Sequence, residues 1–271
     1  LLVPFLLIVV QPDPGSALVF GSFFYPLFRE GLNMAYIVIF FSVLALFVLS
    51  LSFSIGLVVG MLIVTVFFLF FILKYLNRKT KTWPFLLSML FAVVFCFSVD
   101  YIFNNVFEQR HRDRINIVLG KEVDAKGVGY NINQSKIAIG SGGSDGKGFL
   151  QGTQTKGDFV PEQHTDYIFS TIGEEWGFMG TSLTILLFSI LIIRLISRAE
   201  KQPNHFRRIY SYCFASLIFF HFFINVGMSI GLIPSIGIPL PFISYGGSSL
   251  LIFSLMFFVY INFDSSRLKE D

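Results

Sequence analysis

The sequence predicts an all-α, polytopic transmembrane protein, a single transmembrane domain over residues 1–271 with one large extracytoplasmic loop before the last three spans. Composition is the first reason. The 271 residues are 54% hydrophobic and only 14% charged, 35 of them are Phe, and the mean hydropathy is +0.70. Soluble domains do not have this composition. The second reason is that the apolar residues gather in runs of about 20, the length of a helix that crosses a bilayer.

Six of these runs are expected to be membrane-spanning helices, because a helix satisfies its own backbone hydrogen bonds in lipid. They are about Met34–Phe53, Ile55–Leu73, Trp83–Phe107, Phe178–Ile196, Ile209–Ile230 and Ile243–Phe263. An earlier apolar segment, residues 1–28, is interrupted by two prolines at the polar elbow Gln11-Pro12-Asp13-Pro14-Gly15. Proline breaks a helix, so this segment is either two short spans or one long kinked helix.

The beginning of the chain lies inside an apolar run, with no charged region or cleavage site of a signal peptide. We therefore expect a fragment whose upstream spans are missing. Cys96 and Cys213 also lie in apolar runs and have no CxxC spacing. Buried free thiols are expected at both positions.

Basic residues predict which helix ends face the cytoplasm. Outside residues 108–166, every Lys and Arg lies at Arg29 or within residues 74–81, 194–208 or 267–269. These places fall on one side of the membrane if the spans alternate as assigned, and the positive-inside rule makes that side the cytoplasm. Residues 108–166 then form the extracytoplasmic loop, which by elimination is the catalytic or binding region.

Polar side chains gather where this loop meets the span that begins near Phe178. Glu162, His164, Thr165 and Asp166 follow one another there, in a chain that otherwise avoids charge. Polar groups at a membrane face usually carry chemistry, so Asp166 is the candidate catalytic residue. The alternative is that Asp166 or Thr165 only caps a helix over residues 167–176.

Glycine marks a second feature of the loop, since ten of the 23 glycines lie between Gly120 and Gly157. Glycine permits close backbone approach and positive φ angles, although a flexible linker has the same composition. Residues 134–139 are apolar enough to form a short interfacial helix.

Five sequence blocks resemble the SEDS family (shape, elongation, division and sporulation), which comprises RodA, FtsW and SpoVE. They occur in the family's order and span nearly the whole chain. The blocks are Gln11-Pro12-Asp13-x-Gly15-Ser16, Arg112-x-Arg114-Ile115, residues 134–143, Pro161-Glu162-x-His164-Thr165-Asp166, and Asn225 through Gly231-Leu232-x-Pro234 to Ser244-Tyr245-Gly246-Gly247-Ser248-Ser249. Residues 152–154 and 160–166 look most like the RodA (elongation) branch. Because members have more spans, the chain resembles their C-terminal portion.

The resemblance implies a peptidoglycan glycosyltransferase that polymerises lipid II on the outer face of the bacterial cytoplasmic (inner) membrane, for cell elongation and shape. The acceptor hydroxyl would attack the donor sugar with inversion, and undecaprenyl pyrophosphate would leave. The family's catalytic Asp maps onto Asp166. The implied partners are a class B penicillin-binding protein (a transpeptidase) and other membrane proteins of the elongation complex; nothing indicates nucleic acid.

Further residues are candidates for binding this substrate. Two phosphates need positive charge, and Arg112 and Arg114 are spaced to face one ligand from an extended or turn segment; lipid-headgroup binding is the alternative. The other candidates are Lys136, Lys147, Glu162, His164, Ser244 and Tyr245, the last two as polar lining from a broken loop over residues 234–249. Glu174 and Glu175 are expected to form structural ion pairs, and His221 to be a buried structural histidine.

Metal dependence and function keep alternatives. Glu162 could bind a divalent cation (Mg²⁺ or Mn²⁺) or pair with a loop arginine, but no cluster has metal-ligand spacing. The first alternative function is a lipid II flippase, which needs charges through the middle of the membrane. The second is a non-catalytic scaffold of the elongation complex, which gives no reason for Asp166.

Overall fold

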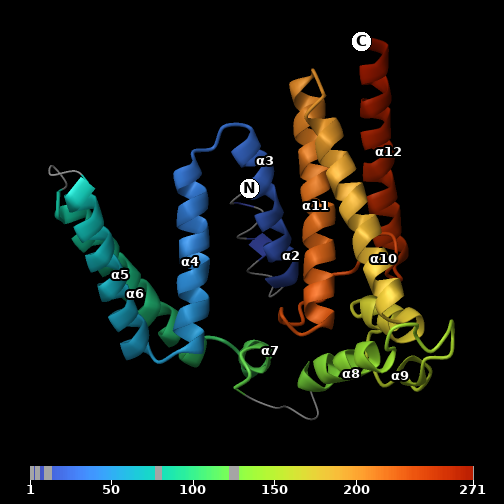
Figure 1. Cartoon of the computed structure of the whole chain (residues 1–271), viewed down its shortest axis with the longest axis horizontal. Coiled ribbons are helices and arrows are strands. Elements are labelled where there is room, and N and C mark those ends of the chain that lie inside the picture. Colours follow the sequence, from blue (N-terminus) through green and yellow to red (C-terminus); the bar gives the residue numbers. More distant parts are fainter. Residues whose placement is uncertain (1–2, 4–6, 9–13, 77–80, 122–127, 271) are drawn as a thin grey trace. The chain divides into compact units, whose positions relative to one another are not determined.

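The computed structural model describes residues 3, 7–8, 14–76, 81–121 and 128–270, and every regular element in these residues is helical (Figure 1). The predicted all-α class is therefore confirmed. The chain divides into two compact units, Leu1–Leu32 with Asn116–Asp271, and Asn33–Ile115.

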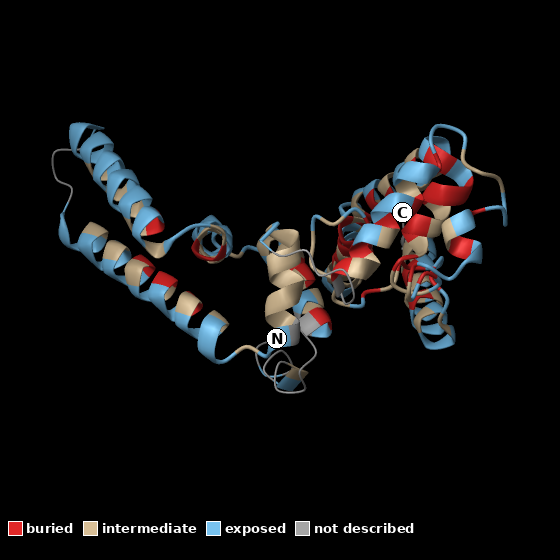
Figure 2. Cartoon of the chain, turned by 90° about the horizontal axis from the view of Figure 1, so that it is seen from below, coloured by how far each residue is buried: buried red, intermediate tan, exposed pale blue. Residues whose placement is uncertain are grey.

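The unit of residues 33–115 contains three antiparallel apolar helices. These are α4 (Met34–Ser52), α5 (Ile55–Leu76) and α6 (Trp83–Asn105), and both α4 and α5 pack against α6. The Asn33 side chain begins α4 by accepting a hydrogen bond from Ala35 N at 2.9 Å. Most of their apolar residues are exposed (Figure 2), which suits helices that are surrounded by lipid.

The other unit is built around α10 (Ile168–Ala199), α11 (His205–Ser229) and α12 (Gly247–Glu270). Helix α11 packs against both α10 and α12 (Figure 1), and the core between them includes Leu195, Ile218 and Leu240. Against α11 also lie the short helices α2 (Pro14–Val19), η1 (Phe20–Phe23) and α3 (Phe24–Arg29).

The six predicted spans are confirmed as six helices that are long and apolar enough to cross a membrane, so the protein is a multi-pass membrane protein. Several boundaries differ by a few residues, and two differences concern the site. Helix α12 begins at Gly247 and not near Ile243, because residues 232–246 form no helix, as expected for the broken loop. Helix α10 begins at Ile168 and continues through a break at Gly177. The described part of residues 1–28 forms only short helices, and the elbow at 11–13 lies outside the described residues.

Three shorter helices follow α6 and precede α10 in sequence: α7 (Gln109–Val118), α8 (Val128–Ser141) and α9 (Thr153–Lys156). Helix α8 packs against α10 and α11, and Ser135 Oγ donates to Ser229 O at 2.8 Å. The helix expected over 134–139 is therefore present and longer than predicted. Both cysteines are free thiols, as expected; Cys96 is buried and Cys213 half-buried.

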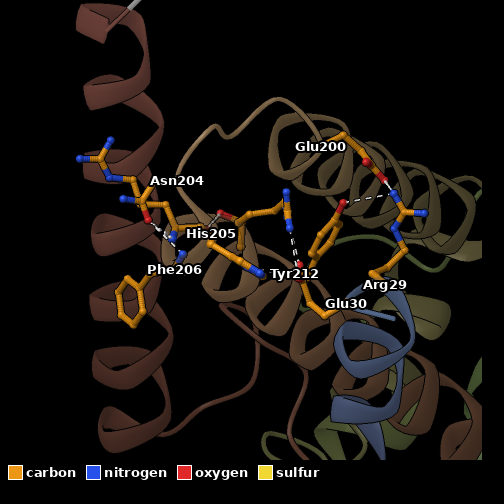
Figure 3. Close-up of polar contacts among 10 residues, drawn as sticks. Arg29, Glu30, Glu200, Asn204, His205, Phe206 and Tyr212 are labelled. Carbon is orange, nitrogen blue, oxygen red and sulfur yellow. Dashed lines mark hydrogen bonds and ion pairs between the residues drawn. The ribbon is translucent and has the colours of Figure 1, made fainter. Parts of the chain in front are cut away.

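At the end of α10 and α11 farthest from Asp166, charged side chains join α3 to the α10–α11 connection (Figure 3). Arg208 donates two hydrogen bonds to the Glu30 carboxylate, at 3.0 and 3.1 Å, and Arg29 pairs with Glu200. These bonds from Arg208 hold the pKa of Glu30 below its usual value. His205 Nδ1 lies 3.2 Å from the same carboxylate.

Candidate active site

Asp166 lies in a tight turn that leads into α10, and its side chain is partly buried. The backbone N–H groups of Thr165, Asp166 and Tyr167 all donate to Glu162 O, at 3.0 to 3.2 Å. Glu162 closes the turn with a φ of +56°, and its carboxylate accepts from Thr165 Oγ1 at 3.0 Å. The N-cap of α10 is Tyr167, without a capping side chain. The N-cap position is therefore neither Asp166 nor Thr165, and it lies one and two residues away from where the alternative places it.

Three successive carbonyl groups of this turn are held by residues from the last part of the chain. Tyr245 N donates to His164 O at 2.8 Å and Ser244 Oγ donates to Thr165 O at 2.6 Å. Asn225 Nδ2 donates to Asp166 O at 2.9 Å. The backbone on which the Asp166 carboxylate is mounted is thus fixed at three consecutive positions.

The segment between α11 and α12 folds against the same turn. Asn225 Nδ2 also donates to Ile238 O at 2.9 Å, and Leu240 N donates to Ser244 Oγ at 2.8 Å. Gly237 has a φ of +73°, and a Cβ at Gly237 would lie 3.4 Å from Asp166 Oδ2. The absence of a side chain at Gly237 leaves space beside the carboxylate.

The glycine-rich segment (residues 142–148) repairs a break in α10. Gly177 has φ +62° and ψ −155°, so the helix is broken there. The N–H groups of Phe178 and Met179 therefore lose their helical bonds to the carbonyl groups of Glu174 and Glu175. All four groups bond to the glycine-rich segment instead: Phe178 N to Gly143 O (2.8 Å), Met179 N to Ser144 O (3.2 Å), Lys147 N to Glu174 O (2.9 Å) and Gly148 N to Glu175 O (2.9 Å).

This docking explains the glycines of the segment. A Cβ at Gly142 would lie 2.0 Å from Gly173 O, and one at Gly146 would lie 2.2 Å from Glu175 O. No side chain fits at those distances. For residues 142–148 the flexible-linker alternative is therefore wrong, and the close approach that these glycines allow is to the backbone of α10.

A buried carboxylate, Glu174, joins the glycine-rich segment to α9. Its side chain is 0% exposed, and Oε1 accepts from Lys147 Nζ at 2.7 Å and from Gln154 N at 2.8 Å. Its other oxygen accepts from Thr155 N at 2.9 Å. The structural ion pair expected for Glu174 is therefore present. Glu175 is buried beside it.

The structure brings some of the predicted binding residues to the Asp166 turn. Glu162 and His164 are exposed members of it. Ser244 is buried and its hydroxyl is occupied by Thr165 O and Leu240 N, so it holds backbone and does not line a site with a free hydroxyl. The Tyr245 side chain is exposed, while its backbone holds His164.

The two predicted lysines, Lys147 and Lys136, differ in their contacts. Lys147 is bonded to Glu174 and to Thr153 Oγ1, both at 2.7 Å. Lys136 is exposed on α8, and its side chain lies over Gly231, where a Cβ would be 2.3 Å from Lys136 Cε. Both lysines belong to the unit that contains Asp166.

The expectation that Arg112 and Arg114 face one ligand from an extended segment is wrong. Both lie in helix α7, where two residues of separation turn the side chains about 200° apart. Arg112 also donates at 3.0 Å to Asn104 O, near the end of α6. The two side chains therefore leave α7 in different directions.

Sequence reasoning assigned no role to Asn225, although it belongs to the last resemblance block. Its side chain is 0% exposed, and a buried amide in an apolar helix was the available signal. The expected structural role of His221 is present, since its Nδ1 lies 3.2 Å from Pro239 O. Among the described residues, no group of three or more His, Cys, Asp or Glu is placed to hold a metal ion.

The chain is similar to known proteins in both sequence and fold. The chain is 41% identical over 156 residues to the peptidoglycan glycosyltransferase MrdB of Escherichia coli K12, covering 58% of this chain and 42% of that protein. It is 42% identical over 137 residues to RodA of Treponema pallidum, covering 51% and 32%, and 35% identical over 184 residues to the probable peptidoglycan glycosyltransferase FtsW of Enterococcus hirae, covering 68% and 46%. These alignments thus cover less than half of each relative.

A solved structure is also similar. A chain of a peptidoglycan synthase complex, described as coordinating polymerization and crosslinking, matches with a TM-score of 0.52 and 28% identity over 73% of this chain and 53% of that chain. The model of the family described as cell cycle protein (FtsW, RodA, SpoVE) matches residues 55–268, which include the turn of Asp166 and all three helices around it. The chain belongs to this FtsW/RodA/SpoVE family, as the five sequence blocks predicted.

Proposed function

We propose that this chain carries the active site of an inverting peptidoglycan glycosyltransferase. It polymerises lipid II on the outer face of the bacterial cytoplasmic membrane, for cell elongation. Family membership and the names of the relatives support the reaction class. The observation that carries the proposal is the Asp166 turn, in which a partly buried carboxylate stands on a backbone fixed by Asn225, Ser244 and Tyr245.

Asp166 acts as the general base. It takes the proton of the 4-hydroxyl of the acceptor GlcNAc as that oxygen attacks C1 of the donor MurNAc. The bond from C1 to the pyrophosphate oxygen breaks, undecaprenyl pyrophosphate leaves with the electron pair, and the anomeric configuration inverts. The open space at Gly237, beside Asp166 Oδ2, gives the acceptor hydroxyl room to approach the base.

The leaving pyrophosphate needs a cation that is not already neutralised. Lys147 is paired with the buried Glu174, so it contributes mainly to the structure. Lys136 is exposed in the same unit and overlies the start of the segment that contains Gly237. We assign the phosphate contact first to Lys136. Arg112 and Arg114 contribute singly if at all, because they do not share a face of α7.

Substitution of Asp166 tests the assignment in polymerisation of purified lipid II. Asp166→Asn keeps the size of the side chain but removes the base, and a loss of about 10²–10⁴ in rate is expected. Asp145→Asn is the control, because Asp145 is an exposed carboxylate of the same loop that accepts from Ser144 Oγ. Normal polymerisation by a folded Asp166→Asn variant contradicts the proposal.

The partner and the cofactor are separate proposals. The similar chain from a synthase complex supports pairing with a class B penicillin-binding protein, which co-purification from native membranes tests. A requirement for Mg²⁺ or Mn²⁺ stays a prediction. It is tested by comparing polymerisation in EDTA with polymerisation after each metal is restored.

A further inference from the structure

We propose that Asn225 is a positioning residue for the Asp166 carboxylate, acting as a clamp between the Asp166 turn and the segment that contains Gly237. This inference rests on the proposed function, because it assigns a residue to the same site. Asn225 does not touch the reacting atoms; it holds the two pieces of backbone between which those atoms meet.

The hydrogen bonds of Asn225 connect two segments that are far apart in sequence, the Asp166 turn and the segment that contains Gly237. Its amide nitrogen has two hydrogens, and each has a carbonyl acceptor at 2.9 Å, Asp166 O and Ile238 O. These acceptors are 59 and 13 residues away in sequence. The full donor capacity of one side chain therefore fixes the distance between the base and the segment beside it.

Burial makes this clamp stiff. Asn225 is 0% exposed, and it lies on α11 next to Ile224 and near Met228, both in the core cluster that includes Ile238. Water has no access to replace its bonds. Its oxygen accepts no hydrogen bond from the described residues. The amide therefore acts at this site through its two donors.

The carbonyl that Asn225 holds belongs to Asp166 itself, so loss of the bond acts on the base directly. The neighbouring bonds from Ser244 and Tyr245 hold Thr165 and His164 and keep the turn in place without Asn225. What changes is the orientation of the Asp166 carboxylate and its distance to the space at Gly237. A misplacement of about 1 Å at a reacting group costs about 10²-fold in rate.

Two substitutions test the clamp in the full protein, with lipid II as the substrate. Asn225→Leu keeps the branched shape and the number of side-chain heavy atoms and removes both donors; Asn225→Ser, whose shorter side chain has one donor and cannot make both bonds, is the second variant in case the larger leucine prevents folding. Each is expected to lower kcat about 10- to 100-fold while the apparent KM stays within about threefold, because the base is displaced and the substrate contacts are kept.

Gln202→Leu is the matched control. Gln202 is also a buried amide that donates to a backbone carbonyl, Phe263 O at 3.3 Å, and its oxygen also has no partner among the described residues. It lies at the opposite end of α10. Gln202→Leu is expected to lower thermal stability to a similar degree and to leave kcat unchanged.

Hydrogen–deuterium exchange supplies a readout that does not need the reaction. Both Asn225 variants are expected to speed exchange in residues 162–168 and 236–246 together, whereas Gln202→Leu leaves these peptides unchanged. Unchanged exchange there, or a kcat equal to wild type in a protein that Asp166→Asn inactivates, overturns the clamp. If exchange rises as expected but Asp166→Asn polymerises normally, the clamp stands and the proposed base is wrong.

Discussion

Removing the ammonium of Lys147 is expected to destabilise the protein through the buried Glu174. Lys147→Met keeps most of the side-chain volume but leaves a carboxylate of 0% exposure without its cation. Breaking a buried ion pair from one side costs about 3–5 kcal/mol. Here the bonds from Gln154 N and Thr155 N remain, and the Lys147 side chain is 26% exposed. We therefore expect a loss of about 2–4 kcal/mol in the free energy of unfolding.

The assay is equilibrium unfolding in mixed micelles, followed by circular dichroism, with Lys156→Met as the control. Lys156 is exposed on α9 and makes no ion pair among the described residues, so its loss should cost less than about 0.5 kcal/mol. In a Glu174→Gln background, Lys147→Met should cost less than about 1 kcal/mol, because its charged partner is gone. Equal costs for Lys147→Met and Lys156→Met, or an undiminished cost of Lys147→Met in the Glu174→Gln background, would refute the reasoning.

Three further predictions concern the helix break, the polar cluster and the topology. Gly177→Ala is expected to cost more than about 3 kcal/mol, because φ is +62° and the new Cβ would lie 2.4 Å from Gly146 N, whereas Gly60→Ala in open space should be neutral or stabilising; midpoints of thermal unfolding decide this. The lowered pKa of Glu30 means that its bonds to Arg208 contribute stability above the unfolded-state pKa and lose it as the pH falls through the folded-state value. The stability difference between wild type and Glu30→Gln should therefore shrink in titrations below about pH 4.5. In a protein without its two cysteines, Lys156→Cys should react with a membrane-impermeant thiol reagent in intact spheroplasts and Lys201→Cys should not; the reverse pattern would invert the topology.

The spans could be predicted from the sequence because their signal is local. A run of about 20 apolar residues is long enough to cross the membrane wherever it packs, so α4, α5 and α6 were located to within a few residues. The repair of α10 was not predicted. It depends on hydrogen bonds between backbone groups about thirty residues apart, which no side-chain pattern encodes.

The candidate site could be predicted only in part, because some of its residues have a local sequence signal and others depend on contacts between distant residues. Asp166 stood out as a carboxylate in an apolar chain and through its resemblance block. Asn225 lay in another block, but its partners are backbone carbonyls of distant residues, so its role needed the fold. The expectation for Arg112 and Arg114 is wrong because it assumes an extended segment, whereas a helix places residues of this spacing on different faces.

The order of synthesis differs between two sets of contacts near α10: those of the glycine-rich segment with the helix break, and those that hold the Asp166 turn. Residues 143–148 precede α10, so the groups that complete its broken turn have already been made when Glu174 to Met179 emerge from the ribosome. The Asp166 turn is different, since Asn225 and Ser244 follow their partners in it by 59 and 79 residues. A nascent chain that ends before α11 therefore contains the groups that complete α10 and none of the three that hold the Asp166 turn. The base reaches its final position only when the last part of the protein has been translated and inserted.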